Sequence, residues 1–395
     1  MDSVQEKYFQ LLTEIDDICR ENNISYYLSC RTALSAYVNN EMNESWYNPS
    51  VMMTAAECRR FMKAVEEQNR SDRVLESMLT HGKYPHFTLK YTDTESLCFM
   101  IKQRDNYKVH GISIIINIII YLPKGIKKKV GSVLRIGWHD NACPYARDGS
   151  LSKKAMLSKI ALKPFIAVNR DAVGRFIFEY FMKIYSRTTR TPHMVLTTGG
   201  TRRLKESWLK ADADYVSING RKFPVLADCN GYLTALYGKG YRSKVNAGMP
   251  NNIYRIVDAN ISFEEFKKRN RAFFEDNKFS QTVKKNNKLN KENKVYNDAI
   301  NEAWNLALAV GSKMQVKKQY TKEKKERLFS LYESGAYTEL YSELKDYINS
   351  TVKAEKYRIR PYADKDLARL SEETLRVLGN NVLAGQMRKI QKVIK

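Results

Sequence analysis

Three side chains in the first part of this sequence could do chemistry on a phosphate group. Arg31 lies in the small-residue turn Ser29–Thr32, where its guanidinium could bind two phosphate oxygens at once. Lys90 could hold a phosphate by charge alone, and His110 could act as a general acid or base. Each has a structural alternative: an ion pair for Arg31, a solvent-exposed charge for Lys90, and a hydrogen bond at a strand end for His110.

Hydrophobic patterns predict the elements that position Arg31. Apolar residues at spacings of three and four predict a helix over residues 4–22, followed by a short strand at Ile24–Leu28. The turn that carries Arg31 comes next, and a second short helix, Thr32–Val38, follows it. A loop then leads to a second apolar run, Val51–Met53.

Two further strands are predicted. Phe87–Tyr91 carries Lys90. Ile112–Tyr121 is the strongest strand signal in the chain, because near-continuous isoleucine is typical of a central strand buried on both faces. Asn117 is a polar residue within that run, and the period of a strand places it on the same side as Ile115.

Beyond residue 123 the sequence becomes basic and helical. Charged and apolar residues interleave over Lys124–Arg135, and an amphipathic helical pattern follows from about Ser152 to Tyr185. This pattern fits either a basic helix at a membrane surface or two packed helices with solvent-exposed lysines. Further on, Asn219-Gly220 predicts a hairpin turn between two short strands.

Five separated segments resemble, in order and approximate spacing, the LicD family, which includes phosphocholine transferases acting on bacterial surface polysaccharides. The segments are LLTEIDDICRENNISYYLSCRTALSAYV, VMMTAAECRRFMKAV, PHFTLKYTDTES, HGISIIINIII and INGRKFPVLADCNGYLTALYGKGY. The resemblance covers roughly half of the chain and leaves residues 260–395 unexplained. It implies a nucleotidyltransferase-like fold, in which a mixed sheet is flanked by helices.

The sequence departs from the family at the positions that carry the family's chemistry. Cys30-Arg31 stands where the family has two glycines, although Thr32 is kept. The family's aspartate cluster falls near Asn48, and a third carboxylate falls at about Ile115. The family uses these carboxylates to hold Mg²⁺ at the transferring phosphate, and neutral Asn48 and Asn117 would bind that ion poorly. The resemblance therefore implies Mg²⁺ as a cofactor, whereas the residues present argue against it, and we expect no metal ligands.

These residues leave three functions open, and whether the chain is an enzyme stays open with them. A LicD-like transferase would move a phosphocholine-type group onto a cell-surface polysaccharide, with an altered active site. A catalytically inactive relative would bind an anionic glycan or a sugar nucleotide. A nucleic-acid binder ranks third, because no basic motif interleaved with aromatic residues occurs. The candidate catalytic residues are His110 and Asn117, and the candidate phosphate- or substrate-binding residues are Arg31, Thr32, Lys90 and Asn48.

Composition limits the class of the protein and its surroundings. The 395 residues are 43% hydrophobic, which indicates a globular chain with room for more than one domain. The formal net charge of +24 favours anionic partners, such as sugar nucleotides, phosphorylated glycans or anionic lipid. Six cysteines without metal-ligand spacing are typical of a reducing compartment, and no apolar run is long enough to span a membrane. We expect a cytoplasmic protein that could associate peripherally with the inner face of the membrane.

The fold class expected from these patterns is α/β, or α+β, in four parts. A nucleotidyltransferase-like core over residues 1–123 is followed by a basic amphipathic helical insertion over 124–200. Residues 201–258 complete the core. Residues 259–395 form a helical C-terminal region with a Lys/Asn-rich tract, in which Ala368–Ile394 is predicted as a helix.

Overall fold

A computed structural model shows a chain that divides into two compact units. Residues 1–253 and 257–271 belong to the first unit, and residues 294–395 to the second. The structure describes residues 3–42, 49–99, 107–142, 153–186, 191–196, 200–245, 256–269, 316–317, 319–356 and 364–393. The Lys/Asn-rich tract and the candidate residue Asn48 lie outside these ranges.

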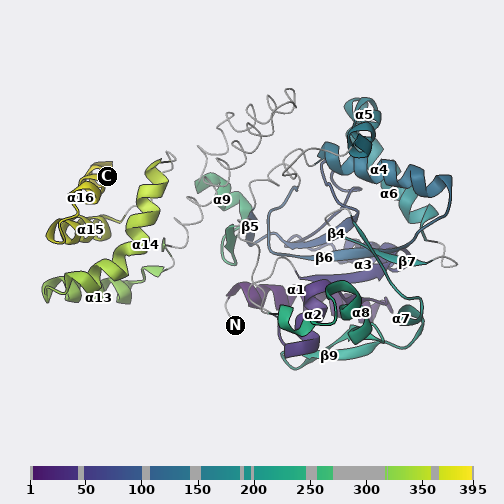
Figure 1. Ribbon diagram of the computed structural model, residues 1–395, viewed down its shortest axis with the longest axis horizontal. Helices are drawn as coiled ribbons and strands as arrows, with labels where there is room; N and C mark the ends of the chain where they lie inside the picture. Colours follow the sequence, from purple (N-terminus) through teal and green to yellow (C-terminus); the bar gives the residue numbers. More distant parts are fainter. Residues whose placement is uncertain are drawn as a thin grey trace. The chain divides into compact units, whose positions relative to one another are not determined.

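The first unit is built on a mixed sheet whose central strand is β6 (Ser113–Tyr121). β2 (Ser50–Thr54) runs parallel to β6 on one side, and β4 (Thr88–Asp93) runs antiparallel on the other. The remaining strands of this sheet are β1 (Tyr27–Leu28), β3 (Arg73–Glu76), β7 (Pro192–Val195) and β8 (Thr201–Arg203). Every residue of β6 is buried, which confirms the predicted central strand, and the α/β class is confirmed as well (Figure 1).

One face of the sheet is apolar and packs on helices α1 (Ser3–Glu21) and α3 (Ala55–Gln68). On this face Tyr91 of β4 lies opposite Ile114 of β6. Phe61 of α3 meets the Tyr91 ring edge-on, with ring centroids 6.2 Å apart. Figure 1 shows both helices on the same side of β4 and β6. Burial of this apolar face against α1 and α3 stabilises the sheet.

The opposite face, which we call the polar face, carries the polar residues of the central strands. Across it, Asn117 of β6 lies opposite Met52 of β2 and Thr88 of β4. In the next row, Lys90 of β4 lies opposite Ile115 of β6. Because side chains alternate along a strand, these residues all point to the same side of the sheet.

The basic region forms three helices, and it packs beside the polar face. They are α4 (Ile126–Ala142), α5 (Lys153–Val168) and α6 (Arg170–Ile184). Asn169 separates α5 from α6, and its side chain caps α6 by accepting a hydrogen bond from the Ala172 N–H at 2.9 Å. Phe87, just before β4, contacts Phe178 and Phe181 of α6, with ring centroids 5.3 and 4.3 Å away. The structure thus contains the two packed helices that the amphipathic pattern allowed.

The predicted hairpin around Asn219-Gly220 is confirmed. Both turn residues have positive φ, 50° and 81°, as a tight hairpin turn requires. The elements around it are α7 (Ser207–Lys210), β9 (Asp214–Ile218), β10 (Arg221–Val225) and α8 (Cys229–Tyr237). β11 (Ile256–Asp258) then pairs with β5 (Leu97–Phe99), and α9 (Phe263–Arg269) follows.

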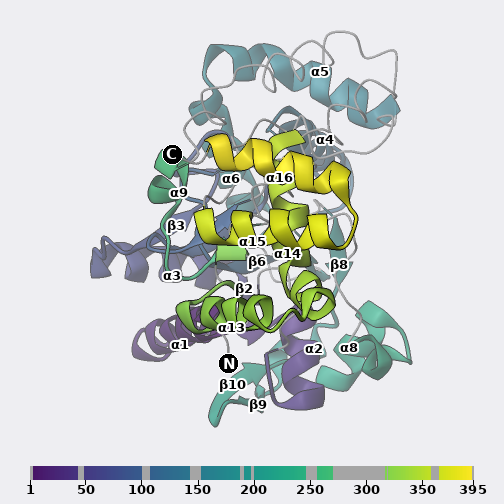
Figure 2. The same cartoon turned by 90° about the vertical axis from the view of Figure 1, so that its left-hand side faces the viewer.

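The described part of the second unit is helical and has a core of its own. Its helices are α13 (Lys322–Glu333), α14 (Tyr337–Lys356), α15 (Lys365–Val377) and α16 (Asn381–Val393). Buried Leu344, Tyr347, Leu367 and Met387 belong to its core. The prediction of Ala368–Ile394 as one helix is wrong, because Gly379, at φ +77°, ends α15 and lets α16 turn back beside it (Figure 2).

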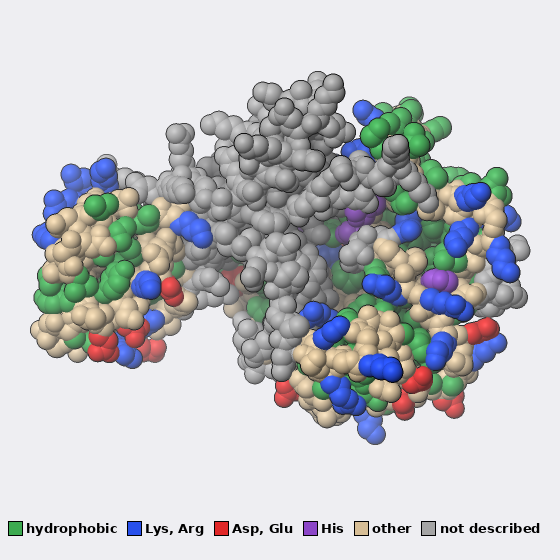
Figure 3. All heavy atoms as spheres, in the orientation of Figure 1, with side chains coloured by type: hydrophobic (Ala, Val, Ile, Leu, Met, Phe, Trp, Pro, Cys, Tyr) green, Lys and Arg blue, Asp and Glu red, His purple; other side chains and the backbone are tan. Residues whose placement is uncertain are grey.

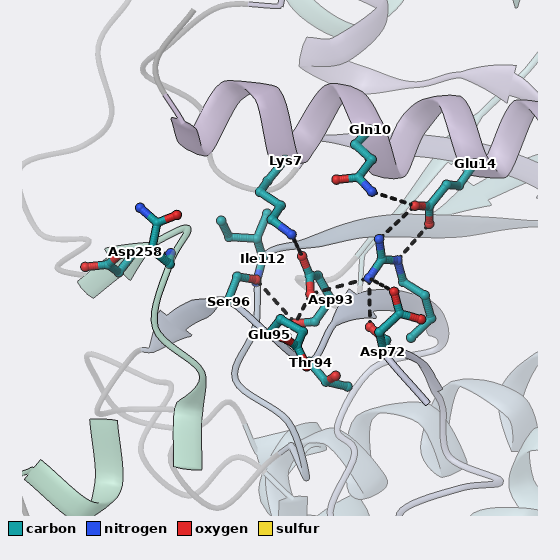
Figure 4. A network of polar contacts seen from close by, with 12 residues as sticks. Lys7, Gln10, Glu14, Asp72, Asp93, Thr94, Glu95, Ser96, Ile112 and Asp258 are labelled. Atoms are coloured by element: carbon teal, nitrogen blue, oxygen red, sulfur yellow. Dashed lines mark hydrogen bonds and ion pairs between the residues drawn. The ribbon is translucent and has the colours of Figure 1, made fainter. Parts of the chain in front are cut away.

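A network of charges ties α1 to β3 and β4 (Figure 4). Arg73 of β3 is 6% exposed and donates two hydrogen bonds of 2.7 Å to the Glu14 carboxylate of α1. Its guanidinium also lies 3.0 Å from Asp72. Lys7 of α1 pairs with the buried Asp93 carboxylate at 2.7 Å. These bonds fix the position of α1 on the apolar face of the sheet.

The arginines of this network keep its carboxylates ionised. Burial raises the pKa of Glu14, but the hydrogen bonds and charge of Arg73 outweigh it, so the pKa lies below its ordinary 4.5. The hydrogen bond from Arg70 lowers the pKa of Asp72 to about 2. A lowered folded-state pKa stabilises the fold above the unfolded-state pKa, and this stability is lost as the pH falls through the folded-state value.

We therefore predict that the free energy of unfolding decreases as the pH falls from about 4.5 towards about 2. Arg73→Met should cost about 3 kcal/mol at neutral pH, because it removes both 2.7 Å hydrogen bonds to Glu14 and leaves Arg70, 3.5 Å away, as the remaining cation beside that carboxylate. That cost should shrink in acid, where Glu14 is protonated. Urea titrations at several pH values measure both effects.

Arg59→Met is the control for this experiment, because Arg59 forms an exposed ion pair with Glu179 at 2.6 Å. It should cost less than about 1 kcal/mol. A difference between Arg73→Met and the wild type that does not change with pH would contradict the role assigned to Glu14.

Candidate functional site

The candidate site lies where the first turn of α2 (Cys30–Asn39) meets the polar face. The Asn117 amide donates to the Ser29 hydroxyl at 2.9 Å, and the Ser29 hydroxyl donates to the Ser50 hydroxyl at 2.9 Å. The Ser50 N–H donates to the Thr32 hydroxyl at 2.7 Å. These groups are buried and satisfy one another, which fixes the turn before α2. The structure thus brings together two predicted site residues, Asn117 and Thr32.

Cys30, the first residue of α2, has a left-handed backbone with φ +52°. This conformation costs a residue other than glycine about 1 kcal/mol or more. The Cys30 N–H donates to the Tyr232 hydroxyl of α8 at 3.0 Å, and that hydroxyl also contacts the Met194 sulfur at 3.7 Å. Burial raises the pKa of the Cys30 thiol to about 11. The thiol is therefore protonated at neutral pH and a poor nucleophile.

Two arginines act electrostatically on Tyr237 of α8. Arg31 is the second residue of the helix. Arg202 of β8 lies opposite Met194, which lies opposite Ile119, so Arg202 is on the polar face. Burial raises the pKa of Tyr237, and the positive charges of Arg31 and Arg202 both oppose that shift, so both charges act on its hydroxyl. The site therefore has a cationic border.

A pocket of about 940 Å³ opens next to Arg202, between β8, α7 and α8. Arg203, Lys205 and Ser207 also line it. None of these residues is among the predicted site residues. The signal that could have found them is the basic segment Arg202–Lys205 directly after the short apolar strand β7.

Lys90 does not lie at the first turn of α2. Its ammonium group is buried 3.4 Å from the Glu76 carboxylate and donates to the Val109 carbonyl at 3.1 Å. It also lies 4.1 Å from the centre of the Tyr107 ring. An ammonium with these partners is already neutralised and positioned. The geometry therefore favours a structural role for Lys90 over the predicted phosphate contact.

His110 belongs to the same part of the polar face as Lys90. Its buried ring packs against Phe99 and Phe263, with centroids 5.1 and 4.5 Å away. β6 begins three residues after His110, and Asn117 lies four residues further, roughly 13 Å along the strand. The two predicted catalytic residues, His110 and Asn117, are therefore not brought together.

The described residues of the site do not suit Mg²⁺. Asn117 is neutral, and Ile115 occupies the position where the resemblance implies a carboxylate. Glu76 is a carboxylate on the polar face, but it accepts a hydrogen bond from the Lys108 N–H at 2.6 Å and pairs with Lys90. Nowhere in the described ranges do three His, Cys, Asp or Glu residues group as metal ligands. Because Mg²⁺ takes oxygen ligands that include one or two carboxylates, no metal-dependent step follows from this geometry.

Comparison with known proteins finds no matching family model, no matching curated protein and no matching solved structure. The contacts and charges of the site are therefore the basis for assigning a function.

The backbone at Cys30 gives a first test of the site. Cys30→Gly should be more stable than Cys30→Ala by about 1 kcal/mol, because glycine adopts positive φ without strain. Both variants lose the thiol, so their difference reports the backbone alone. At an ordinary exposed helix position, Ala161→Gly should instead destabilise by about 1 kcal/mol. Urea unfolding measures all three, and an alanine variant as stable as the glycine variant at position 30 would contradict the assigned strain.

The role of Lys90 is tested by Lys90→Met. This variant should lose about 3 kcal/mol of unfolding free energy, because Glu76 is left buried without its ion pair. Lys83→Met, at an exposed position, should change stability by less than about 0.5 kcal/mol. If Lys90→Met instead keeps its stability and weakens phosphate binding, Lys90 is a ligand contact.

Proposed function

We propose that this chain binds the phosphate groups of a sugar nucleotide or a phosphorylated glycan, as a catalytically inactive relative of LicD-like transferases. The order of elements supports the resemblance: a short strand, a turn, a helix, a second strand, and later the central strand that carries Asn117. Left-handed Cys30 supports it too, because it stands where the family has glycine, the residue that adopts positive φ at least cost.

The observation that carries the proposal is that the positive charges of Arg31, in the first turn of α2, and of Arg202, on β8, both act on the Tyr237 hydroxyl. The N-terminus of a helix carries partial positive charge and N–H groups that favour anions. Guanidinium groups add paired hydrogen bonds that match phosphate oxygens. A phosphate group at the first turn of α2 would interact with the helix N-terminus and with the guanidinium groups. The pocket beside Arg202 has room for the rest of the ligand.

The groups behind the arginines favour binding over transfer. The polar groups behind the arginines form hydrogen bonds with one another; they belong to Asn117, Ser29, Ser50 and Thr32. Phosphoryl transfer by the family's mechanism needs Mg²⁺ to neutralise the transferring group. The described residues of the site include no group of carboxylates that could hold Mg²⁺. The arginines could therefore bind a phosphate without the metal ion that its transfer needs.

Calorimetry with CDP-choline, the type of donor that the resemblance implies, tests the proposal. We expect binding that neither Mg²⁺ nor EDTA changes. Arg31→Ala and Arg202→Ala should each weaken binding about 10- to 100-fold, because each removes a charge-assisted hydrogen bond. Arg175→Ala removes an equal charge at an exposed position of α6 and should leave the affinity unchanged.

Two results would contradict the proposal in different ways. Equal loss of affinity in Arg175→Ala and Arg202→Ala would show a general effect of net charge rather than a site. Turnover of CDP-choline that Arg31→Ala abolishes would show that the chain is a transferase with an altered active site.

A further inference from the structure

One side of helix α5 is apolar and faces solvent. Its large side chains are Met156, Leu157, Ile160, Phe165 and Val168, which are 46%, 66%, 56%, 63% and 88% exposed. At 3.6 residues per turn they cover about half of the helix circumference. We call these five residues the outer face of α5. Figure 3 shows hydrophobic side chains gathered at this helix, at the upper right.

The outer face is not needed to hold α5 in place. On the opposite side of the helix, Ser158, Leu162 and Ile166 are buried. A side chain at Gly137 of α4 would come within 2.4 Å of the Ser158 carbonyl oxygen, so the two helices are in close contact there. Since the inner side provides the packing, the outer face is an exposed apolar patch of the kind that marks an interaction surface.

The charges around the outer face are positive. Lys159 and Lys163 lie along one edge of it, and the sequence of α5 contains no Asp or Glu. The first turn of the neighbouring helix α4 carries exposed Lys127–Lys129. α6 carries two acidic residues: Glu179 is paired with Arg59 of α3 at 2.6 Å, and the Asp171 carboxylate lies against Gly82. A partner of the outer face would therefore meet a cationic border.

We propose that the outer face of α5 docks on an anionic lipid surface. Lysine is depleted from protein–protein interfaces, whereas helices with an apolar face bordered by lysines are typical of binding at anionic headgroups. The apolar side chains would enter the headgroup region, and Lys159 and Lys163 would contact lipid phosphates. No helix in the described part of the chain is long and apolar enough to cross a bilayer, so the helix lies on the surface. This inference does not depend on the proposed phosphate site.

Vesicle co-sedimentation tests the docking. We expect the full chain to bind vesicles of phosphatidylcholine with about 30% phosphatidylserine, and not vesicles of phosphatidylcholine alone. The triple variant Leu157→Gln, Ile160→Gln and Phe165→Gln should bind at least about tenfold more weakly, because it removes the inserted apolar surface. The double variant Lys159→Gln and Lys163→Gln should lose about fivefold per lysine and become less sensitive to salt.

Val382→Gln is the matched control, because Val382 of α16 is 77% exposed and lies in the second unit. It should leave vesicle binding unchanged. The substituted positions are solvent-exposed or at the edge of α5, and unchanged circular dichroism and melting temperature would show that the variants fold.

Three results would overturn the docking proposal. The wild type could fail to sediment with either kind of vesicle, or it could bind vesicles with and without phosphatidylserine equally well. The triple variant could also bind as tightly as the wild type. Self-association of the wild type that the triple variant loses, without vesicle binding, would assign the outer face to a second copy of the chain. A triple variant that loses vesicle binding but still binds CDP-choline would show that the outer face of α5 acts independently of the phosphate site.

Discussion

The structure of the site depends on one buried amide, that of Asn117. It lies in the middle of a strand that is buried on both faces, where an amide without hydrogen-bond partners costs several kcal/mol. Ser29 satisfies it, and Ser50 satisfies Ser29 in turn. These bonds hold the chain so tightly at the end of β1 that Cys30 keeps a left-handed backbone. The direction in which α2 leaves the sheet, and with it the position of Arg31, follows from this turn.

The positive charges of the chain fall into groups with different roles, although the sequence presents them as one large excess. Arg73 and Lys90 are buried and paired with carboxylates, so they hold elements together. Arg31 and Arg202 border a site whose other groups are neutral and bonded to one another. The lysines of α5 lie beside exposed apolar side chains. Burial and the nearest carboxylate, rather than net charge, distinguish these roles.

Patterns within short stretches of the sequence predicted much of the fold. The isoleucine run identified the central strand, because a strand that is buried against protein on both faces is rich in apolar residues along its whole length. Asn219-Gly220 identified the hairpin, because both residues tolerate positive φ. Gly379 was overlooked within a long helical pattern, and the helix ends there. The strand, the hairpin turn and the helix end each depend on the backbone preferences of a few adjacent residues, so a short stretch of sequence is enough to predict them.

The sequence by itself determined the central strand, the hairpin turn and the neutral residues at positions 115 and 117. Only the tertiary structure decided which polar residues share a site. Strand pairing placed Arg202 on the polar face, although it is far from the other strands' polar residues in the sequence. The same pairing placed Glu76 beside Lys90 and left His110 far from Asn117. Partners across a sheet depend on which strands pair and in which register, and the local sequence of one strand does not specify its neighbour.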